Sequence, residues 1–293
     1  SAARVWGTLE NDVITDDGSN HNIYGLDGAD QISGGIGDDY IDGGNDDDSL
    51  TGGAGADTVI GGAGDDTVYV DNDGASADDL QGGTNTAAGD TLNAAAIAAG
   101  VTVDLDTSGQ TIDTGDTISG FENFIGGAGD DTIDGTTGAN ILSGGAGNDT
   151  ISGLAGNDTI NGDAGEDRLS DGTGVDTVNG GADNDYFIVA DDSEADVFDG
   201  GSESDTLDLS AFTAGVEVNL DTNVNNTGNT ISNFENVITT GAYADTITGN
   251  ASVNVITSGD GADILDGAAG EDTLQGEAGN DTLIGGAGAD MLD

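Results

Sequence analysis

Apolar residues recur along this chain with a period of nine positions. Between Gly126 and Ile188 the sequence divides into successive nonapeptides without a shift of register: GGAGDDTID, GTTGANILS, GGAGNDTIS, GLAGNDTIN, GDAGEDRLS, DGTGVDTVN and GGADNDYFI. The eighth position of every nonapeptide is aliphatic or Phe, the sixth is usually Asp and the first is usually Gly. A nine-residue period fits neither a 3.6-residue helix nor the alternation of a simple strand. It indicates a repeat architecture.

Each nonapeptide is predicted to form a turn followed by a short strand. The first six positions are small, flexible and acidic, which is typical of turns. The last three, as in residues 132–134, alternate polar, apolar and polar, so the strand buries its middle residue. Two nonapeptides would complete one coil, which places residue i against residue i+18 at a strand spacing of about 4.8 Å. The sequence therefore predicts an all-β fold, a parallel β-solenoid of stacked coils.

The nonapeptides fall into three blocks, which we expect to form one continuous solenoid. In the first two blocks they are followed by less regular segments, which we interpret as wider coils of the same solenoid. A separate linker domain is the alternative for these segments. The predicted divisions are block 1 at residues 1–125 with nonapeptides at 7–69, block 2 at 126–239 with nonapeptides at 126–188, and block 3 at 240–293.

Stacking of the coils would place the sixth-position carboxylates above one another in columns. Carboxylates at that spacing repel strongly unless a cation lies between them. Together with the carbonyls of Gly-rich turns they form an all-oxygen ligand set, which suits Ca²⁺ better than Mg²⁺ or Zn²⁺. Pairing aspartates eighteen positions apart predicts about eleven shared Ca²⁺ ions. The candidate ligands are Asp12, Asp30, Asp39, Asp48, Asp57, Asp66, Asp131, Asp149, Asp158, Asp167, Asp176, Asp185, Asp245, Asp263, Asp272, Asp281 and Asp290.

The second nonapeptide of each block lacks the sixth-position aspartate. The residues in its place are His21, Asn140 and Asn254. This shared departure indicates duplication of a whole block, and it predicts a weak or absent ion at that level. An Asn oxygen can still ligate Ca²⁺, whereas a neutral His21 would not suit it.

The charge of the chain limits its partners. It has 58 acidic residues against two basic ones, a formal net charge of −56, and 54 Gly. Such a composition favours disorder in the absence of divalent ions, and we expect order in their presence. Nucleic acid and anionic membranes are poor partners, because their charge has the same sign. No apolar run approaches the ~20 residues that span a bilayer, so we predict no membrane insertion.

The nonapeptides resemble the RTX (repeats-in-toxin) motif G-G-x-G-x-D-x-U-x, in which U is a large apolar residue. GGAGDDTVY at 61–69 and GGAGNDTIS at 144–152 follow it closely. The resemblance implies a right-handed parallel β-roll, in which aspartate side chains and turn carbonyls of stacked turns share Ca²⁺. It covers most of the chain in repeated copies, so the signal is specific.

The sequence offers no catalytic set, and we predict that the protein is not an enzyme. Its single histidine, His21, occupies an aspartate position of a repeat, and the chain has no Cys or Lys. Serine residues lack a histidine base that would activate them. The carboxylate pairs, which in another context would suggest a glycosidase, are accounted for by calcium.

We expect an extracellular calcium-binding structural protein, secreted or at the cell surface, that folds on Ca²⁺. Calcium sites of extracellular modules bind at roughly 0.1–1 mM, a concentration found outside cells. Regular repeats near both ends would leave unpaired strand edges, which favours head-to-tail association of copies into a filament or surface layer.

Two alternatives remain at this stage. The chain would otherwise be a calcium-dependent module or adhesin stalk of a larger secreted RTX protein, or an ice-binding solenoid. The outward seventh positions form no regular Thr array, which disfavours ice binding. Besides a second copy of the chain, a cell-surface polysaccharide is a candidate partner, since some of the tyrosines would be able to contact sugars.

Overall fold

The computed structural model describes residues 2–16, 18–71, 76–86, 88–107, 110–112 and 115–293. Across these residues the secondary structure consists of strands, without helices, so no segment of the described ranges has the helical length and apolar character needed to cross a bilayer. The chain forms two compact units, Ser1–Gly147 (unit 1) and Asn148–Asp293 (unit 2). The prediction of an all-β, parallel β-solenoid is confirmed. The division into three blocks stays a prediction.

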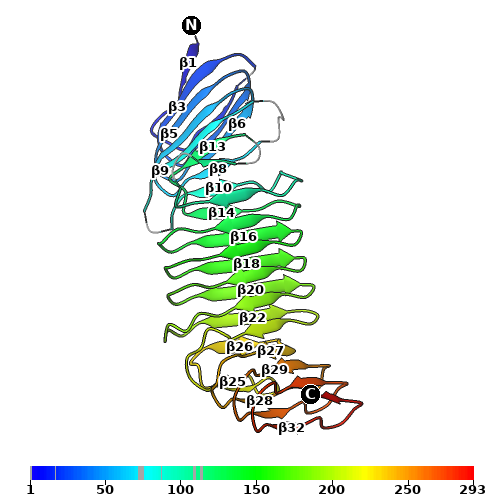
Figure 1. The fold of residues 1–293 in the computed structure, drawn as a ribbon. Helices are drawn as coiled ribbons and strands as arrows, with labels where there is room; N and C mark the ends of the chain where they lie inside the picture. The colour runs from blue at the N-terminus through cyan, green and yellow to red at the C-terminus, as the bar shows by residue number, and fades with distance from the viewer. Residues whose placement is uncertain (1, 17, 72–75, 87, 108–109, 113–114) are drawn as a thin grey trace. The chain divides into compact units, whose positions relative to one another are not determined.

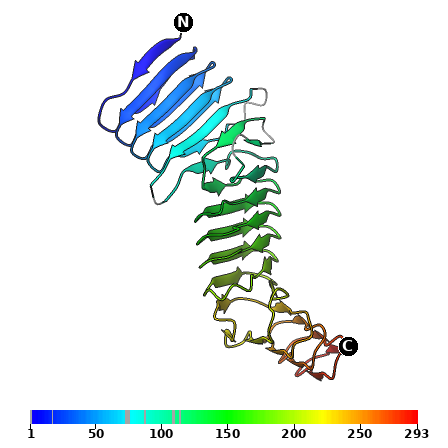
Figure 2. The same cartoon turned by 60° about the vertical axis from the view of Figure 1, so that its left-hand side comes forward.

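Unit 1 contains two parallel sheets that receive alternate nonapeptides. Figure 2 shows the earlier strands of the first sheet side by side, in blue and cyan. This sheet has the order β1 (Ala3–Trp6), β3 (His21–Asp27), β5 (Tyr40–Asn45), β7 (Thr58–Ala63), β9 (Asp79–Thr84), β13 (Thr117–Ser119) and the antiparallel β12 (Gln110–Thr111). The second has the order β2 (Val13–Thr15), β4 (Gln31–Ile36), β6 (Ser49–Ala54), β8 (Thr67–Tyr69), β10 (Thr91–Asn93), β14 (Asn123–Ile125) and β16 (Ile141–Ala146). A further pair joins β11 (Thr102–Asp104) to β15 (Thr132–Asp134).

Unit 2 repeats this arrangement with three sets of strands, and Figure 1 shows β18, β20 and β22 stacked in order. The first set is β18 (Thr159–Ala164), β20 (Thr177–Ala182), β22 (Val197–Gly201) and β26 (Thr230–Ser232). The second is β17 (Thr150–Ser152), β19 (Arg168–Ser170), β21 (Tyr186–Ile188), β23 (Thr206–Asp208), β27 (Asn236–Ile238), β29 (Val255–Thr257), β31 (Thr273–Gln275) and β33 (Met291–Leu292). The third is β25 (Val224–Asn225), β24 (Glu217–Asn219), β28 (Thr246–Thr248), β30 (Ile264–Asp266) and β32 (Thr282–Ile284).

The register of the regular strands is eighteen residues, as predicted. Ile23 pairs with Ile41, which pairs with Val59 on the next coil. In unit 2, Leu169 pairs with Phe187 in the same way. Two nonapeptides therefore make one coil, and identical positions of the repeat lie directly above one another.

The interior of each coil is narrow. The eighth-position residues, such as Ile32 and Leu50, are buried because they alternate with outward residues along a short strand. Aromatic side chains also pack in the interior. In unit 2 the ring of Phe187 lies edge-on to Phe234 at 4.9 Å and to Phe198 at 6.3 Å between centroids. Such contacts add about 0.5–1.5 kcal/mol to the burial of the rings.

Close stacking of the turns requires glycine at particular positions. Gly44 in β5 has a φ of 118°, and a Cβ there would overlap the carbonyl oxygen of Leu26 on the preceding coil. Only glycine adopts this backbone readily and tolerates that approach. Gly138, by contrast, lies in a turn where an added Cβ would meet nothing closer than Thr136 Oγ1, at 3.6 Å.

We predict that Gly44→Ala destabilises the Ca²⁺-loaded protein, whereas Gly138→Ala changes its stability by at most about 0.5 kcal/mol. The left-handed backbone alone costs Ala about 1 kcal/mol, and the clash with the Leu26 carbonyl adds to it. Thermal unfolding followed by circular dichroism measures both variants. Equal melting temperatures for the two variants would contradict this account of coil stacking.

Candidate metal centres

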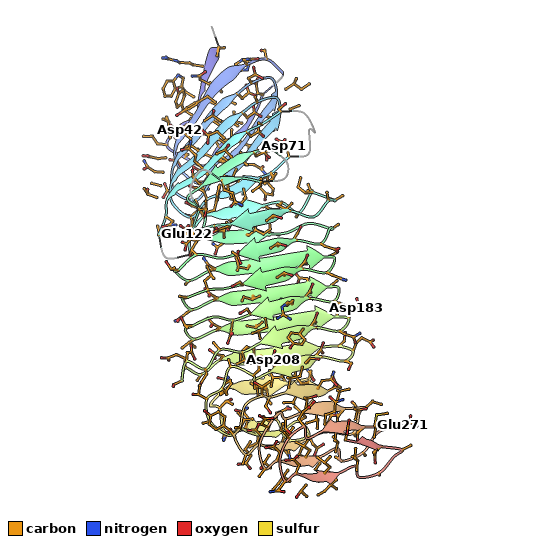
Figure 3. All side chains as sticks on the ribbon, in the orientation of Figure 1. Asp42, Asp71, Glu122, Asp183, Asp208 and Glu271 are labelled. Atoms are coloured by element: carbon orange, nitrogen blue, oxygen red, sulfur yellow. The ribbon has the colours of Figure 1, made fainter. Side chains whose placement is uncertain are left out.

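The sixth-position aspartates lie inside the coils. Asp30 is 2 % exposed, Asp48 3 % and Asp66 1 %. Positions six and eight are two residues apart as the turn enters the strand, so both side chains point to the same, interior face. The columns of carboxylates and the columns of apolar residues are therefore neighbours inside each unit. Acidic residues at other positions, such as Asp183 and Glu271 of unit 2, are exposed at the turns (Figure 3).

One oxygen of most column aspartates accepts a backbone hydrogen bond from the neighbouring coil. The amide N–H of Asp30 donates to Asp48 Oδ1 at 2.8 Å, and the N–H of Asp48 donates to Asp66 Oδ1 at 2.8 Å. In unit 2, Asp167 N–H donates to Asp185 Oδ1 at 2.9 Å. The predicted contact between residues eighteen apart is present, but it joins a carboxylate to an amide rather than two carboxylates to each other.

The second oxygen of many column aspartates is buried and accepts no hydrogen bond. A buried polar atom without a partner costs roughly 1–3 kcal/mol, and more when it is charged. A cation would supply the missing interaction. The aspartates whose Oδ2 is in this state are Asp30, Asp39, Asp48, Asp57, Asp66, Asp90, Asp167, Asp176, Asp185, Asp205, Asp263 and Asp272.

A first-position glycine leaves room beside most of these oxygens. A Cβ on Gly43 would fill the space on which Asp48 Oδ2 and the carbonyl oxygen of Gly61, on the next coil, converge. The same convergence recurs at Gly180, with Asp185 Oδ2. Carboxylate and carbonyl oxygens are the ligands that Ca²⁺ prefers, so the residues present fit a calcium ion held between successive turns.

Burial makes these carboxylates hard to ionise without a cation. It is the main cause that raises the pKa of Asp48 to about 7; the Asp30 amide lowers this pKa and the neighbouring Asp66 and Asp30 carboxylates raise it. In unit 2, burial likewise raises the pKa of Asp167 and of Asp185 to about 7. A divalent cation between the turns would offset both the burial and the repulsion.

The predicted ligands divide into two groups by exposure. The half-buried ones are Asp12, Asp281 and Asp290, and Asp281 still accepts the amide of Asp263 at 3.0 Å. The buried ones are Asp30, Asp39, Asp48, Asp57, Asp66, Asp131, Asp149, Asp158, Asp167, Asp176, Asp185, Asp245, Asp263 and Asp272. Their role as metal ligands, and the number of about eleven ions, stay predictions.

The columns also continue through the irregular coils, which the eighteen-residue criterion missed. Asp66 N–H donates to Asp90 Oδ1 at 2.8 Å, twenty-four residues on, and Asp185 N–H donates to Asp205 Oδ1 at 2.8 Å. The sequence signal was the triplet Asp-x-Leu, which both of these aspartates begin. Backbone hydrogen bonds from the preceding coil identify three further column members, Asp78, Asp116 and Asp196.

A third carboxylate joins the column at one level of unit 1. Oxygen atoms of Asp57, Asp71 and Asp78 lie within 4.8 Å of one another. Asp71 comes from the irregular segment after β8 and also accepts the amide of Gly53 at 2.9 Å. Three carboxylates therefore converge at this point of the column. Spacing in the sequence did not reveal it, because Asp71 lies outside the sixth position.

The two asparagines that replace a column aspartate donate hydrogen bonds to the preceding coil. Asn140 Nδ2 donates to the carbonyl of Glu122 at 2.6 Å, and Asn254 Nδ2 donates to the carbonyl of Glu235 at 2.7 Å. Asn254 Oδ1 lies beside Gly249, in the place that Oδ2 has in the aspartates, and accepts the amide N–H of Asn250 at 2.9 Å. An ion at that level would meet an uncharged oxygen that already accepts a hydrogen bond, which is a physical reason for the predicted weak or absent ion.

A family model of the RTX calcium-binding nonapeptide repeat, which spans four copies, matches more than half of the chain. The matches fall in all three predicted blocks. A search of curated proteins found no match. The matched segments are residues 6–41, 18–50, 42–74, 116–151, 125–160, 134–169, 161–193, 231–265 and 257–292.

We predict that Asp48→Asn raises the Ca²⁺ concentration at the folding midpoint about tenfold, which corresponds to about 1.4 kcal/mol. The substitution removes a buried charge whose Oδ2 would face the ion. Asp106→Asn, at an exposed position of the same unit, serves as the matched control and should leave the midpoint within about twofold. Calcium titrations followed by circular dichroism compare them, and equal midpoints would argue against an ion at Asp48.

We also predict opposite effects of pH with and without calcium. The raised pKa values of Asp48 and Asp185 mean that the fold binds protons up to about pH 7, whereas the unfolded chain releases them above about pH 4. In chelator, the stabilisation by protonation is complete below about pH 4 and lost as the pH rises through about 7. Lowering the pH from 7.5 to 5 should therefore increase β structure in chelator, yet raise the Ca²⁺ midpoint because protons compete with the ion. A midpoint independent of pH would contradict this.

Proposed function

Because the chain belongs to the RTX calcium-binding nonapeptide repeat family, we propose that it is a secreted structural protein whose coils fold when extracellular Ca²⁺ enters the aspartate columns. The observation that carries this proposal is the succession of buried carboxylate oxygens that accept no hydrogen bond, such as those of Asp48, Asp66 and Asp185. Each is costly alone and favourable beside a divalent ion. The free energy of calcium binding then becomes free energy of folding.

The extracellular location rests on calcium availability. Sites of this kind, made of carboxylates and turn carbonyls in extracellular modules, bind at roughly 0.1–1 mM. The cytosol does not supply that concentration, so the chain would stay unfolded there and fold after export. With a formal net charge of −56, the uncomplexed chain repels itself, which keeps it extended until calcium is present.

The role is structural rather than catalytic. The RTX β-solenoid is a calcium-binding scaffold, and the single histidine of the chain, His21, contacts Asp16 rather than a nucleophile. We assign no reaction to the protein.

A second part of the proposal is head-to-tail association of copies. Among the described residues, β1 and β2 each have a strand neighbour on one side, and so has β33 of unit 2. Large apolar residues are exposed at these edges, including Trp6 (56 %), Leu9 (69 %) and Met291 (65 %). An open, apolar strand edge favours addition of a strand from another chain. If the chain is instead a module of a larger secreted RTX protein, neighbouring segments of that protein would pair with these strand edges.

The backbone of β2 offers a specific way to block such association. On successive coils, the amide that begins the strand donates to the coil before it, as Gln31 N–H does to the Asp12 carbonyl and Ser49 N–H to the Asp30 carbonyl. The equivalent amide in β2 is that of Val13, which points to the outer edge of the sheet. A proline there removes an outward donor and spares the hydrogen bonds within the chain.

We predict that the protein is disordered in EGTA, and that millimolar Ca²⁺ brings both β structure and species larger than the monomer. Val13→Pro should fold with Ca²⁺ but stay monomeric, while the control Val13→Thr, which keeps the amide, should associate like the unmodified protein. Circular dichroism and sedimentation velocity measure the two properties separately. Unchanged β structure in EGTA would refute calcium-dependent folding, and a folded monomer at millimolar Ca²⁺ would refute self-association and favour a module of a larger protein.

A further inference from the structure

Two departures from the repeat in the second nonapeptide of unit 1 contact each other. Its first position holds Asp16 where most nonapeptides have Gly, and its sixth position holds His21 where most have Asp. In a regular nonapeptide the first-position glycine lies against the sixth-position carboxylate, as Gly34 does against Asp39 Oδ2. Here the carboxylate Oδ2 of Asp16 occupies that place and contacts the imidazole Nδ1 of His21.

A third ligand reaches the same point from the next coil. One side-chain ligand atom from each of Asp16, His21 and Asp39 lies within 4.8 Å of the others. Asp39 is 3 % exposed. Its Oδ1 accepts the backbone N–H of His21 at 2.7 Å, while its Oδ2 is buried and accepts no hydrogen bond. The side chains of His21 and Asp16 are only 13 % and 7 % exposed.

We propose that Asp16, His21 and Asp39 form a site for a divalent transition-metal ion of the Zn²⁺ type, distinct from the calcium sites of the same solenoid. Zn²⁺ binds imidazole nitrogen and carboxylate oxygen readily, and three protein ligands with one further position form a common zinc arrangement. Ca²⁺ prefers oxygen ligands alone. Two carboxylates also balance the charge of the ion, so the site is neutral once His21 binds in its unprotonated form.

The equivalent places in the rest of the chain lack this chemistry. The second nonapeptides at 135–143 and 249–257 begin with Gly and carry Asn140 and Asn254 at the sixth position. They supply neither an imidazole nor a first-position carboxylate. Since His21 is the single histidine of the sequence, the inference concerns one zinc ion per chain.

The site would connect adjacent coils where the calcium column is interrupted. Asp16 and His21 belong to the coil of β3, and Asp39 begins the coil of β5. The sequence alone predicts a weak or absent calcium ion at His21. A zinc ion bound to His21 and Asp39 would restore a metal link between these coils, using ligands that calcium does not favour.

The test is a zinc titration of the full chain in millimolar Ca²⁺, which keeps the solenoid folded and the oxygen-only sites occupied. We expect one Zn²⁺ to bind with a Kd in the micromolar range or below, measured by isothermal titration calorimetry. His21→Asn, which introduces the residue found at the equivalent positions, should weaken this binding at least tenfold. Asp106→Asn, at an exposed position of the same unit outside the aspartate columns, is the control and should leave zinc binding unchanged.

A spectroscopic readout keeps the test decisive if a variant folds poorly. In the unmodified protein, the nitrogen resonances of the single imidazole should shift on addition of Zn²⁺ and stay unshifted on addition of further Ca²⁺. Co²⁺ should give the visible absorption of a site with nitrogen and oxygen ligands. Three results would each overturn the proposal. His21→Asn would bind Zn²⁺ as tightly as the unmodified protein, Ca²⁺ would displace the bound Zn²⁺ as readily as it displaces Mg²⁺, or the imidazole resonances would not shift on addition of Zn²⁺.

Discussion

The fold depends on how its columns of buried carboxylates are compensated. An aspartate two positions before a buried apolar residue must share its interior face, so each nonapeptide brings a carboxylate beside its hydrophobic side chain. One apolar side chain per nonapeptide makes a thin interior, which cannot by itself offset stacked buried charges. Calcium, which RTX repeats bind in their Asp-rich turns, would provide the compensating charge, and its binding free energy would then become part of the folding free energy. The same arrangement would explain why a chain so acidic can form an ordered solenoid.

Glycine shapes the metal centres as much as aspartate does. The absent Cβ of Gly43 leaves the space on which Asp48 Oδ2 and the Gly61 carbonyl converge. A side chain at that position changes the chemistry of the whole level, because it points at the sixth-position residue. Asp16 is such a case, and the residue it meets is His21. Small substitutions in a repeat can thus turn an oxygen-only site into one with nitrogen and oxygen ligands while the strands keep their register.

The irregular coils show how the solenoid tolerates insertions. Asp90 and Asp205 hold the column position although they lie twenty-four and twenty residues beyond their hydrogen-bond donors, Asp66 and Asp185. The short segment from the aspartate to the buried residue keeps its place on the coil, as Leu92 pairs with Val68. Stacking of the coils requires the local triplet of an aspartate, an outward residue and a buried apolar residue. The length of chain between successive triplets can vary.

The amino-acid sequence alone established the nine-residue period, the strands, the pairing of residues eighteen apart and the presence of aspartate columns, because all of these follow from local patterns repeated in constant phase. It did not reveal that the two oxygens of a column carboxylate have different partners. Oδ1 of Asp48 accepts a backbone amide N–H, whereas Oδ2 accepts no hydrogen bond and is left for a cation. Nor did it reveal Asp71 beside Asp57, or Asp16 against His21. Those contacts depend on how irregular segments and substituted turns pack in three dimensions, and the repeat pattern carries no information about that packing.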